Sequence, residues 1–151
     1  MAAASSADVI VADRRISRWV SAEYYGNPDE IEGAAFGVVR DGELIAGFVF
    51  HDWQPRRGTI ELSAVATRKG WLTREFLRRT GGYAFGQLTC RLLVVRTSEH
   101  NRPVRSIFKK LGGVEHVIAG IRGPNEAEVI ITLSAEAWRD YEDRHAPTPC
   151  S

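Results

Sequence analysis

Cysteine is scarce in this sequence, and the long apolar runs of membrane proteins are absent. The 151 residues include two cysteines, Cys90 in an apolar run and Cys150 beside the C-terminus, so we expect no disulfide. No segment approaches the roughly 18 consecutive apolar residues of a transmembrane helix. The first residues also lack the basic start and apolar stretch of a secretory signal peptide. We therefore expect a protein that works in a reducing, cytoplasmic setting and does not enter a membrane.

Histidine and cysteine do not form a metal-binding pattern. The short spacings of structural metal sites do not occur. The four histidines are scattered along the chain, at His51, His100, His116 and His145. We therefore expect no metal ion. His51 lies beside Asp52 at the end of an expected strand, and it is the histidine that we consider as a lining residue of a substrate cleft.

Charge is small in total but unevenly distributed. The formal net charge is +1, yet the segment 54–110 holds 13 Lys and Arg against three Asp and Glu. A basic segment of this kind indicates either a polyanionic partner, such as a phosphorylated cofactor or nucleic acid, or a solvated basic face balanced by acidic flanks. The content of 44% hydrophobic and 26% charged residues is that of a globular protein.

Hydrophobic periodicity predicts an α/β (α+β) fold with a mixed, mostly antiparallel central sheet of six to seven strands flanked by helices. Asp41-Gly42 is a strong hairpin signal between the first two strands. We expect a disordered segment 1–7, one domain over 8–145 and a flexible tail 146–151. Strands are expected at 34–40, 44–53, 59–66, 90–97, 114–122 and 126–134, and helices at 12–26, from near 71 with a kink at 80–82, at 102–113 and at 135–145.

The strand 59–66, the next helix and the strand 90–97 predict a right-handed crossover between parallel strands. The second of these strands is almost continuously apolar, so we expect it to be buried on both faces. The turn into the helix reads TRKGW. A helix that follows a parallel strand offers unpaired N–H groups and its positive dipole end to an anion. Gly70 permits a tight turn there, and Thr73 can cap the helix or bind a phosphate.

Two segments of the sequence are distinctive, IELSAVATRKGWLTREFL and NRPVRSIFKKLGG. Together with the order of elements, they resemble the GNAT (Gcn5-related N-acetyltransferase) family. In the first, Gly70 matches the family's pyrophosphate loop and Leu72 replaces its second small residue. In the second, Asn101 and Gly112 match and Gly113 replaces an aromatic residue. The resemblance covers roughly residues 30–134. It is to the ribosomal-protein N-terminal acetyltransferases and to similar GNATs of bacterial and phage genomes.

The resemblance implies acetyl-CoA as the acetyl donor and a primary amine as the acceptor. The strand before the loop would pair its backbone with the pantetheine arm, and the loop would hold the pyrophosphate. Arg74, Arg102 and Arg105 would add positive charge. The resemblance implies these coenzyme-binding residues: Ala64, Val65, Ala66, Arg68, Lys69, Gly70, Trp71, Leu72, Thr73, Asn101 and Phe108.

Acetyl transfer to an amine requires a base, an oxyanion donor and a route for the thiolate to leave. Glu61 is the candidate general base, because the resemblance places a glutamate on this strand; a surface ion pair is the alternative. The oxyanion donor would be a backbone N–H near Val65. Phe108 stands where the family usually has a proton-donating tyrosine, so Ser106, Ser98 or a water would replace it.

Three functions remain open from the sequence. The first is an N-acetyltransferase for a protein N-terminus or a small amine, with a homodimer as one expected assembly. The second is a catalytically degenerate module that binds an acyl-CoA, which the phenylalanine at position 108 motivates. The third is a phage-type GNAT that acts on nucleic acid, which the basic segment motivates. Alternating aromatic and basic residues that would stack bases are absent, which disfavours the third.

Overall fold

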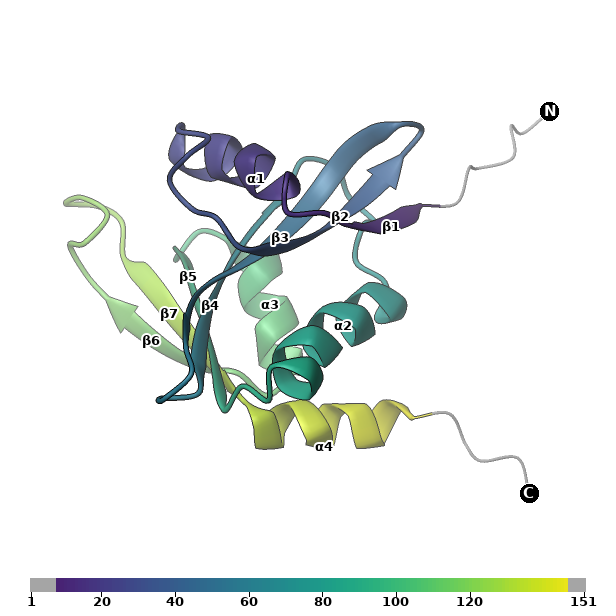
Figure 1. The fold of residues 1–151 in the computed structure, drawn as a ribbon. Coiled ribbons are helices and arrows are strands. Elements are labelled where there is room, and N and C mark those ends of the chain that lie inside the picture. The colour runs from purple at the N-terminus through teal and green to yellow at the C-terminus, as the bar shows by residue number, and fades with distance from the viewer. Residues whose placement is uncertain (1–7, 147–151) are drawn as a thin grey trace, which may run out of the picture.

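The strands form one seven-stranded sheet in the order β1-β2-β3-β4-β5-β7-β6 (Figure 1). The computed structural model describes residues 8–146. Neighbouring strands are antiparallel except β4 and β5, which are parallel. This confirms the parallel pair predicted from the sequence. The strands are β1 (Val9–Ala12), β2 (Ala34–Arg40), β3 (Glu43–Gln54), β4 (Thr59–Ala66), β5 (Leu92–Ser98), β6 (Val114–Ile118) and β7 (Glu128–Ser134).

Helices cover the two faces of the sheet unequally (Figure 1). On one face, α1 (Ile16–Tyr25) packs Ile16 and Val20 against Ala35 and Val49 of the strands. The opposite face carries the main core, to which the other helices contribute Phe76, Phe108 and Trp138. These helices are α2 (Arg74–Gly81), which continues as η1 (Gly82–Gln87), α3 (Arg102–Lys110) and α4 (Ala135–His145).

Local turn chemistry explains two of the element boundaries. Asp41 and Gly42 both have positive φ, 52° and 78°, which is the geometry of a two-residue β-hairpin and confirms the turn between β2 and β3. Gly26 ends α1 in the left-handed conformation, with φ 73°, and its N–H donates to the carbonyl of Ala22. Both boundaries were predicted from the sequence.

The helix after the TRKGW turn begins later than predicted and does not break. It starts at Arg74, since Thr73 accepts a hydrogen bond from the N–H of Phe76 and caps it. The expected kink at 80–82 is instead a widening into the π-helix η1. Gly81 is required for packing, because a Cβ there would lie 2.2 Å from the indole of Trp138.

Two expectations about strands are corrected. β1 was not predicted, because four residues leave too short a pattern, and it pairs with β2. β5 is buried on one face only: Leu93, Val95 and Thr97 are buried, whereas the alternate Arg96 is exposed. The reason is that α1 packs mainly on β2, β3 and β4, and it reaches β5 through the hydrogen bond from Tyr24 to the carbonyl of Arg96.

The expectations for the chain ends concern 1–7 and 146–151, which, apart from the exposed Ala146, lie outside the described residues. Within residues 8–146, no helix has both the length and the apolar character needed to cross a membrane.

Candidate active site

A cleft of about 590 Å³ opens where β4 and β5 separate. The parallel ladder between them ends at Leu62 and Val95, whereas β4 stays paired with β3 as far as Ala66. The N–H of Thr67 donates to the carbonyl of Ile45 at 2.8 Å. The alternation of an antiparallel ladder therefore turns the backbone groups of Ala64 and Ala66 away from β3, toward β5. Past the end of the ladder, these groups face the cleft with no strand to pair them within residues 8–146.

Three walls enclose the cleft. One is the continuous segment 64–72, which includes the end of β4 and the TRKGW turn. The second is the start of α3, with Asn101, Pro103, Val104 and Ile107. The third is the end of α1, with Glu23 and Tyr24. The structure thus brings together Ala64, Val65, Ala66, Arg68, Lys69, Gly70, Trp71, Leu72 and Asn101, all of which were proposed from the sequence.

The turn at the mouth of the cleft is shaped by one glycine. Gly70 has φ 76°, and a Cβ there would meet only the guanidinium of Arg40, at 3.6 Å. Glycine is therefore favoured here by backbone conformation and not by lack of space. Arg40 donates to the carbonyl of Lys69 at 3.1 Å, which ties the turn to β2. Arg68 forms an ion pair with Glu43 at 3.0 Å, and more than half of each side chain is exposed, so an anion can compete for this arginine.

Asn101 has two structural partners besides the cleft. Its side-chain oxygen accepts from the N–H of Val104 and caps α3, and its amide donates to Thr97 at 2.9 Å. Both α2 and α3 thus begin beside the cleft with a side-chain cap. Thr73 itself is the cap of α2 and is not a lining residue.

Four residues proposed from the sequence are not among the lining residues of the cleft: Glu61, Thr73, Ser106 and Phe108. Phe108 is buried in the main core, 5% exposed, and touches the cavity among the helices rather than the cleft. Ser106 is exposed on α3 and is not a lining residue. Tyr24, by contrast, does line the cleft. Its hydroxyl donates to the carbonyl of Arg96 at 3.0 Å and accepts from Arg122 at 3.0 Å.

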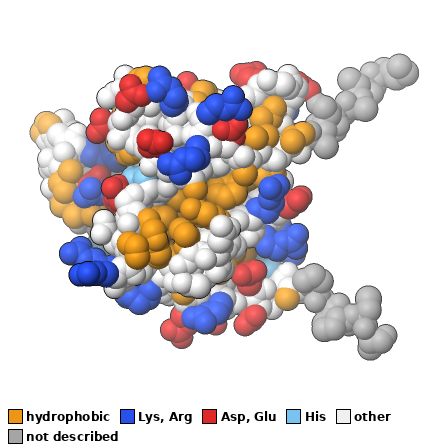
Figure 2. All heavy atoms as spheres, in the orientation of Figure 1, with side chains coloured by type: hydrophobic (Ala, Val, Ile, Leu, Met, Phe, Trp, Pro, Cys, Tyr) orange, Lys and Arg blue, Asp and Glu red, His pale blue; other side chains and the backbone are white. Residues whose placement is uncertain are grey.

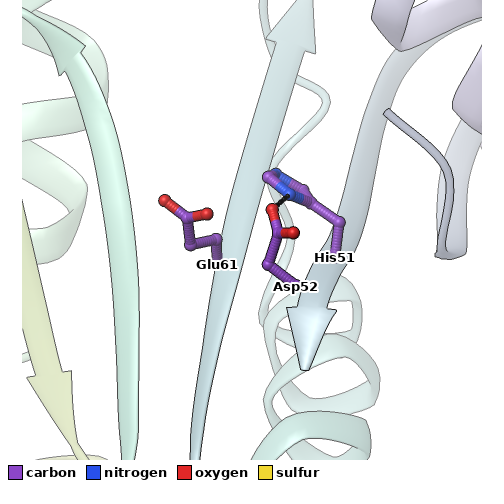
Figure 3. A group of neighbouring side chains, drawn as sticks. All are labelled: His51, Asp52 and Glu61. Atoms are coloured by element: carbon purple, nitrogen blue, oxygen red, sulfur yellow. Dashed lines mark hydrogen bonds and ion pairs between the residues drawn. The ribbon is translucent and has the colours of Figure 1, made fainter. Parts of the chain in front are cut away.

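Glu61 lies on the face of β4 opposite to the core residue Leu62, in a polar group with two residues of β3 (Figure 3). His51 is its direct cross-strand partner. Asp52 accepts from Nδ1 of His51 at 2.6 Å, and ligand atoms of all three side chains lie within 4.8 Å of one another. Nε2 of His51 lies 2.9 Å from Oγ of Ser63, and the hydroxyl of Tyr25 lies 3.3 Å from the same oxygen.

The two carboxyl groups in this site hold protons differently. Burial raises the pKa of Glu61, and a hydrogen bond from its protonated form to Asp52 raises it further. The hydrogen bond from His51, followed by the one from Glu61, lowers the pKa of Asp52. Glu61 is therefore the proton-accepting carboxylate of the pair, whereas Asp52 stays ionised. A carboxylate with a raised pKa is suited to general base chemistry near neutral pH.

A metal ion is a second possible use of His51, Asp52 and Glu61, since their ligand atoms cluster. Both nitrogens of His51, however, already have hydrogen-bond partners. Asp52 already accepts the hydrogen bond from one of these nitrogens. The arrangement within the described residues therefore favours proton handling over metal binding.

Sequence reasoning did not connect His51 to Glu61, and it gave no chemical role to Ser63 or Tyr25. The reason is a bulge. Gln54 pairs with Thr59, and a regular hairpin with that register would set His51 opposite Leu62. The register shifts between Gln54 and His51, where Asp52 has φ 55°, so that His51 lies opposite Glu61 instead.

Comparison with solved structures identifies the fold. An acetyltransferase of Vibrio cholerae, spermidine/spermine N-acetyltransferase SpeG, matches with a TM-score of 0.66 over 88% of this chain and 95% of its own, at 13% identity. The fold is that of the GNAT acetyltransferases. No protein-family model matches the sequence, and no curated protein matches it.

Two further acetyltransferase structures match, one of them over a smaller part of its own length. A protein of T. thermophilus with a provisional acetyltransferase designation matches with a TM-score of 0.59, at 16% identity. The match covers 74% of this chain and 63% of that protein, so this chain spans less than two thirds of it. A further SpeG structure, described as dodecameric, matches over 91% of this chain with a TM-score of 0.66. At these identities the comparisons establish the GNAT fold alone.

Proposed function

We propose that the protein is an N-acetyltransferase that uses acetyl-CoA and acts on a primary amine. The observation that carries the proposal is the separation of β4 from β5, which exposes backbone groups of Ala64 and Ala66 along a cleft of about 590 Å³. An extended arm that carries amides can pair with such an edge as an added strand would. The pantetheine arm of coenzyme A is a ligand of this kind.

The mouth of the cleft fits the phosphates of the same ligand. The turn formed by residues 67–73 leads into the N-terminus of α2, and Gly70 gives it a positive φ. Backbone N–H groups and the positive end of the helix dipole favour an anion there. Arg68 and Lys69 add cationic charge at the lining. Bound acetyl-CoA would supply the acetyl group as a thioester.

Glu61 would act as the general base in direct transfer. An alkyl amine has a pKa near 10, so removing its proton at neutral pH costs about 4 kcal/mol. A carboxylate whose pKa is raised by burial accepts a proton from the acceptor nitrogen more readily than an exposed one does. The N–H groups of Ala64 and Ala66, which face the separation of the strands, are the candidate oxyanion donors near Val65.

The leaving thiolate would not need the missing tyrosine. A thiol has a pKa near 8.5, so the thiolate is a tolerable leaving group. Tyr24 lines the cleft and carries a hydroxyl, which makes it a better placed donor than the exposed Ser106. Removal of the Tyr24 hydroxyl, in Tyr24→Phe, should lower kcat more than the affinity for acetyl-CoA.

Acetyl transfer is tested by incubating the protein with acetyl-CoA and a panel of peptides, polyamines and aminated metabolites. Release of coenzyme A together with an acetylated product in mass spectra is the expected result. Acetyl-CoA binding without transfer to any amine would instead support the degenerate module.

Action on nucleic acid receives less support from the structure. In the view of Figure 2, Lys and Arg side chains are interspersed with Asp and Glu, and no continuous basic track crosses that face within residues 8–146. Arg68 and Arg105, both in the basic segment, form ion pairs with Glu43 and Glu115. Salt-dependent DNA binding at about 50 mM salt would reopen this alternative.

A further inference from the structure

Four side chains beneath the end of α1 form an unbroken hydrogen-bonded chain. Tyr25 lies 3.3 Å from Ser63, Ser63 lies 2.9 Å from Nε2 of His51, and Nδ1 of His51 lies 2.6 Å from Asp52. The chain joins the last residue of α1 to the bulge of β3. Nothing in general acid–base catalysis by Glu61 alone requires Tyr25, Ser63 and His51 to be connected in this way.

The protons in this chain can point in one consistent direction. Asp52 stays ionised, so its carboxylate can only accept, and Nδ1 of His51 carries the proton of that hydrogen bond. In the neutral imidazole Nε2 then accepts from the hydroxyl of Ser63, and because Ser63 has a single proton, the hydroxyl of Tyr25 donates to Ser63. Every donor then points from Tyr25 toward Asp52.

The two ends of the chain are open, while its middle is buried. Ser63 and His51 are 7% and 9% exposed. Tyr25 is 43% exposed, and its ring lies 4.6 Å from that of Tyr24, which lines the cleft. The side chain of Asp52 is 64% exposed at the other end. The chain therefore leads from Tyr25, which contacts the cleft residue Tyr24 but does not itself line the cleft, through the protein interior to solvent.

We propose that Tyr25, Ser63, His51 and Asp52 form a proton relay that carries the proton of the acceptor ammonium to solvent. The proposal rests on the acetyltransferase function proposed above. The ammonium gives a proton to the hydroxyl oxygen of Tyr25, whose own proton moves to Ser63, and the proton of Ser63 moves to Nε2 of His51. One N–H bond of the ammonium is broken and one N–H bond forms on His51. The imidazolium is stabilised by Asp52, and its Nδ1 proton leaves through Asp52 to water.

Ser63, His51 and Asp52 also have the order of a nucleophilic triad, but the surroundings of Ser63 oppose that role. Ser63 is buried, and its hydroxyl already contacts both Nε2 of His51 and the hydroxyl of Tyr25. A nucleophile must reach the carbonyl that it attacks, whereas a relay residue needs only its two hydrogen-bond partners. The geometry therefore points to proton transfer.

Other charged groups act on the relay. Glu61 lies opposite His51 on β4, and Arg96 of β5 acts on Glu61 through its charge. Tyr24 of α1 and Glu30, in the loop after α1, act on Tyr25. The acceptor nitrogen loses two protons in the reaction, one as the ammonium before attack and one from the tetrahedral intermediate. The relay carries the first, and Glu61 accepts the second.

The test compares Tyr25→Phe and Ser63→Ala with Tyr141→Phe, which removes a hydroxyl from α4, away from the cleft. With an alkyl amine at pH 7, the first two should lower kcat/KM by about 10–100-fold and leave the Kd of acetyl-CoA within about twofold. With an amine whose pKa lies below 7, the same variants should approach wild-type rates, because no proton has to leave before attack. Tyr141→Phe should match wild type with both amines.

Equal losses for both amines would overturn the relay, and so would an acetyl group found on Ser63 in protein mass spectra. A wild type that binds acetyl-CoA but acetylates no amine would overturn the proposed function instead. The relay can then be judged without turnover, from the nitrogen resonances of His51 in the wild-type protein. A proton on Nδ1 with Nε2 as acceptor is the expected tautomer, and a proton on Nε2 alone would contradict the relay.

Discussion

The two faces of the sheet use the same strands for different purposes. The face under α2, α3 and α4 is an apolar core in which Phe48, Phe50 and Phe76 pack closely. The face under α1 is apolar only where α1 covers it, around Val49. Beyond the end of α1, the same face carries His51, Glu61 and Ser63, and further along Arg96 and Glu128, which lie 3.6 Å apart.

The difference shows how a short helix can leave polar side chains of the sheet partly exposed. Side chains alternate between the faces of a strand, so Leu62 packs in the core while its neighbours Glu61 and Ser63 turn to the other face. Because α1 ends at Tyr25, it covers these polar side chains only in part and leaves a path to solvent. Substitutions on the packed face should therefore cost stability, and substitutions on the open face should cost activity.

The largest expected loss of stability is on the packed face. Phe76 is fully buried, so Phe76→Ala should lower the free energy of unfolding by about 3–5 kcal/mol in urea denaturation. Val117→Ala, at an apolar residue that is 59% exposed on β6, should stay within about 0.5 kcal/mol of wild type. Similar costs at both positions would mean that the core does not dominate stability.

The largest expected loss of activity is on the open face. Glu61→Gln should lower kcat/KM by about 10²–10⁴-fold with an alkyl amine. In wild type the rate should fall as the pH drops through the raised pKa of Glu61, which gives the pH–rate profile an acid limb. The profile of the variant should lack this limb. The control is Glu142→Gln on α4, which should keep both the rate and the limb. An acid limb that persists in Glu61→Gln would remove Glu61 from the role of base.

The same substitution should not destabilise the protein at neutral pH. A carboxyl whose pKa is raised on folding favours its protonated form, so its contribution to stability declines as the pH rises from 4.5 through the raised value. Gln cannot ionise and escapes this decline. The melting temperature of Glu61→Gln at pH 7–8 should equal or exceed that of wild type, and a clear decrease would show that the charged form is needed for folding.

Substitution by alanine should have opposite effects at a glycine of the turn beside the cleft and at a glycine of the helix that follows it. Gly70 has positive φ, so Gly70→Ala should cost about 1–2 kcal/mol and should also weaken acetyl-CoA binding, as measured by calorimetry. Gly82 has helical φ of −62° and open space around it, so Gly82→Ala should be neutral or stabilising by up to about 1 kcal/mol. Unchanged acetyl-CoA binding by Gly70→Ala would remove the turn from the site.

Loss of two helix caps of the same kind should have similar effects on stability but different, smaller effects on acetyl-CoA binding. Thr73 caps α2 beside the cleft, and Ser134 caps α4 at a distance from it. Thr73→Ala and Ser134→Ala should each cost about 1 kcal/mol of stability. Only Thr73→Ala should also weaken acetyl-CoA binding, since it frays the turn at the mouth of the cleft. Equal affinities in the two variants would place the phosphates elsewhere.

Sequence patterns predicted the sheet and the cleft better than the proton network. The hairpin at Asp41-Gly42, the parallel crossover and the TRKGW turn depend on local chemistry and on alternation, which short segments encode. The pairing of His51 with Glu61 depends on a one-residue bulge at Asp52, which reverses the face of every residue beyond it. The exposed face of β5 depends on where α1 ends, which is a tertiary property.

The most direct test of the account is the melting temperature of the wild-type protein with acetyl-CoA, with AMP as the control ligand. A ligand at 100 times its Kd stabilises by about 2.7 kcal/mol, which corresponds to a shift of about 5–10 °C for a chain of this size. The account predicts a shift of that size with acetyl-CoA and a much smaller one with AMP. No shift up to millimolar acetyl-CoA would contradict the claim that the cleft between β4 and β5 is a coenzyme site.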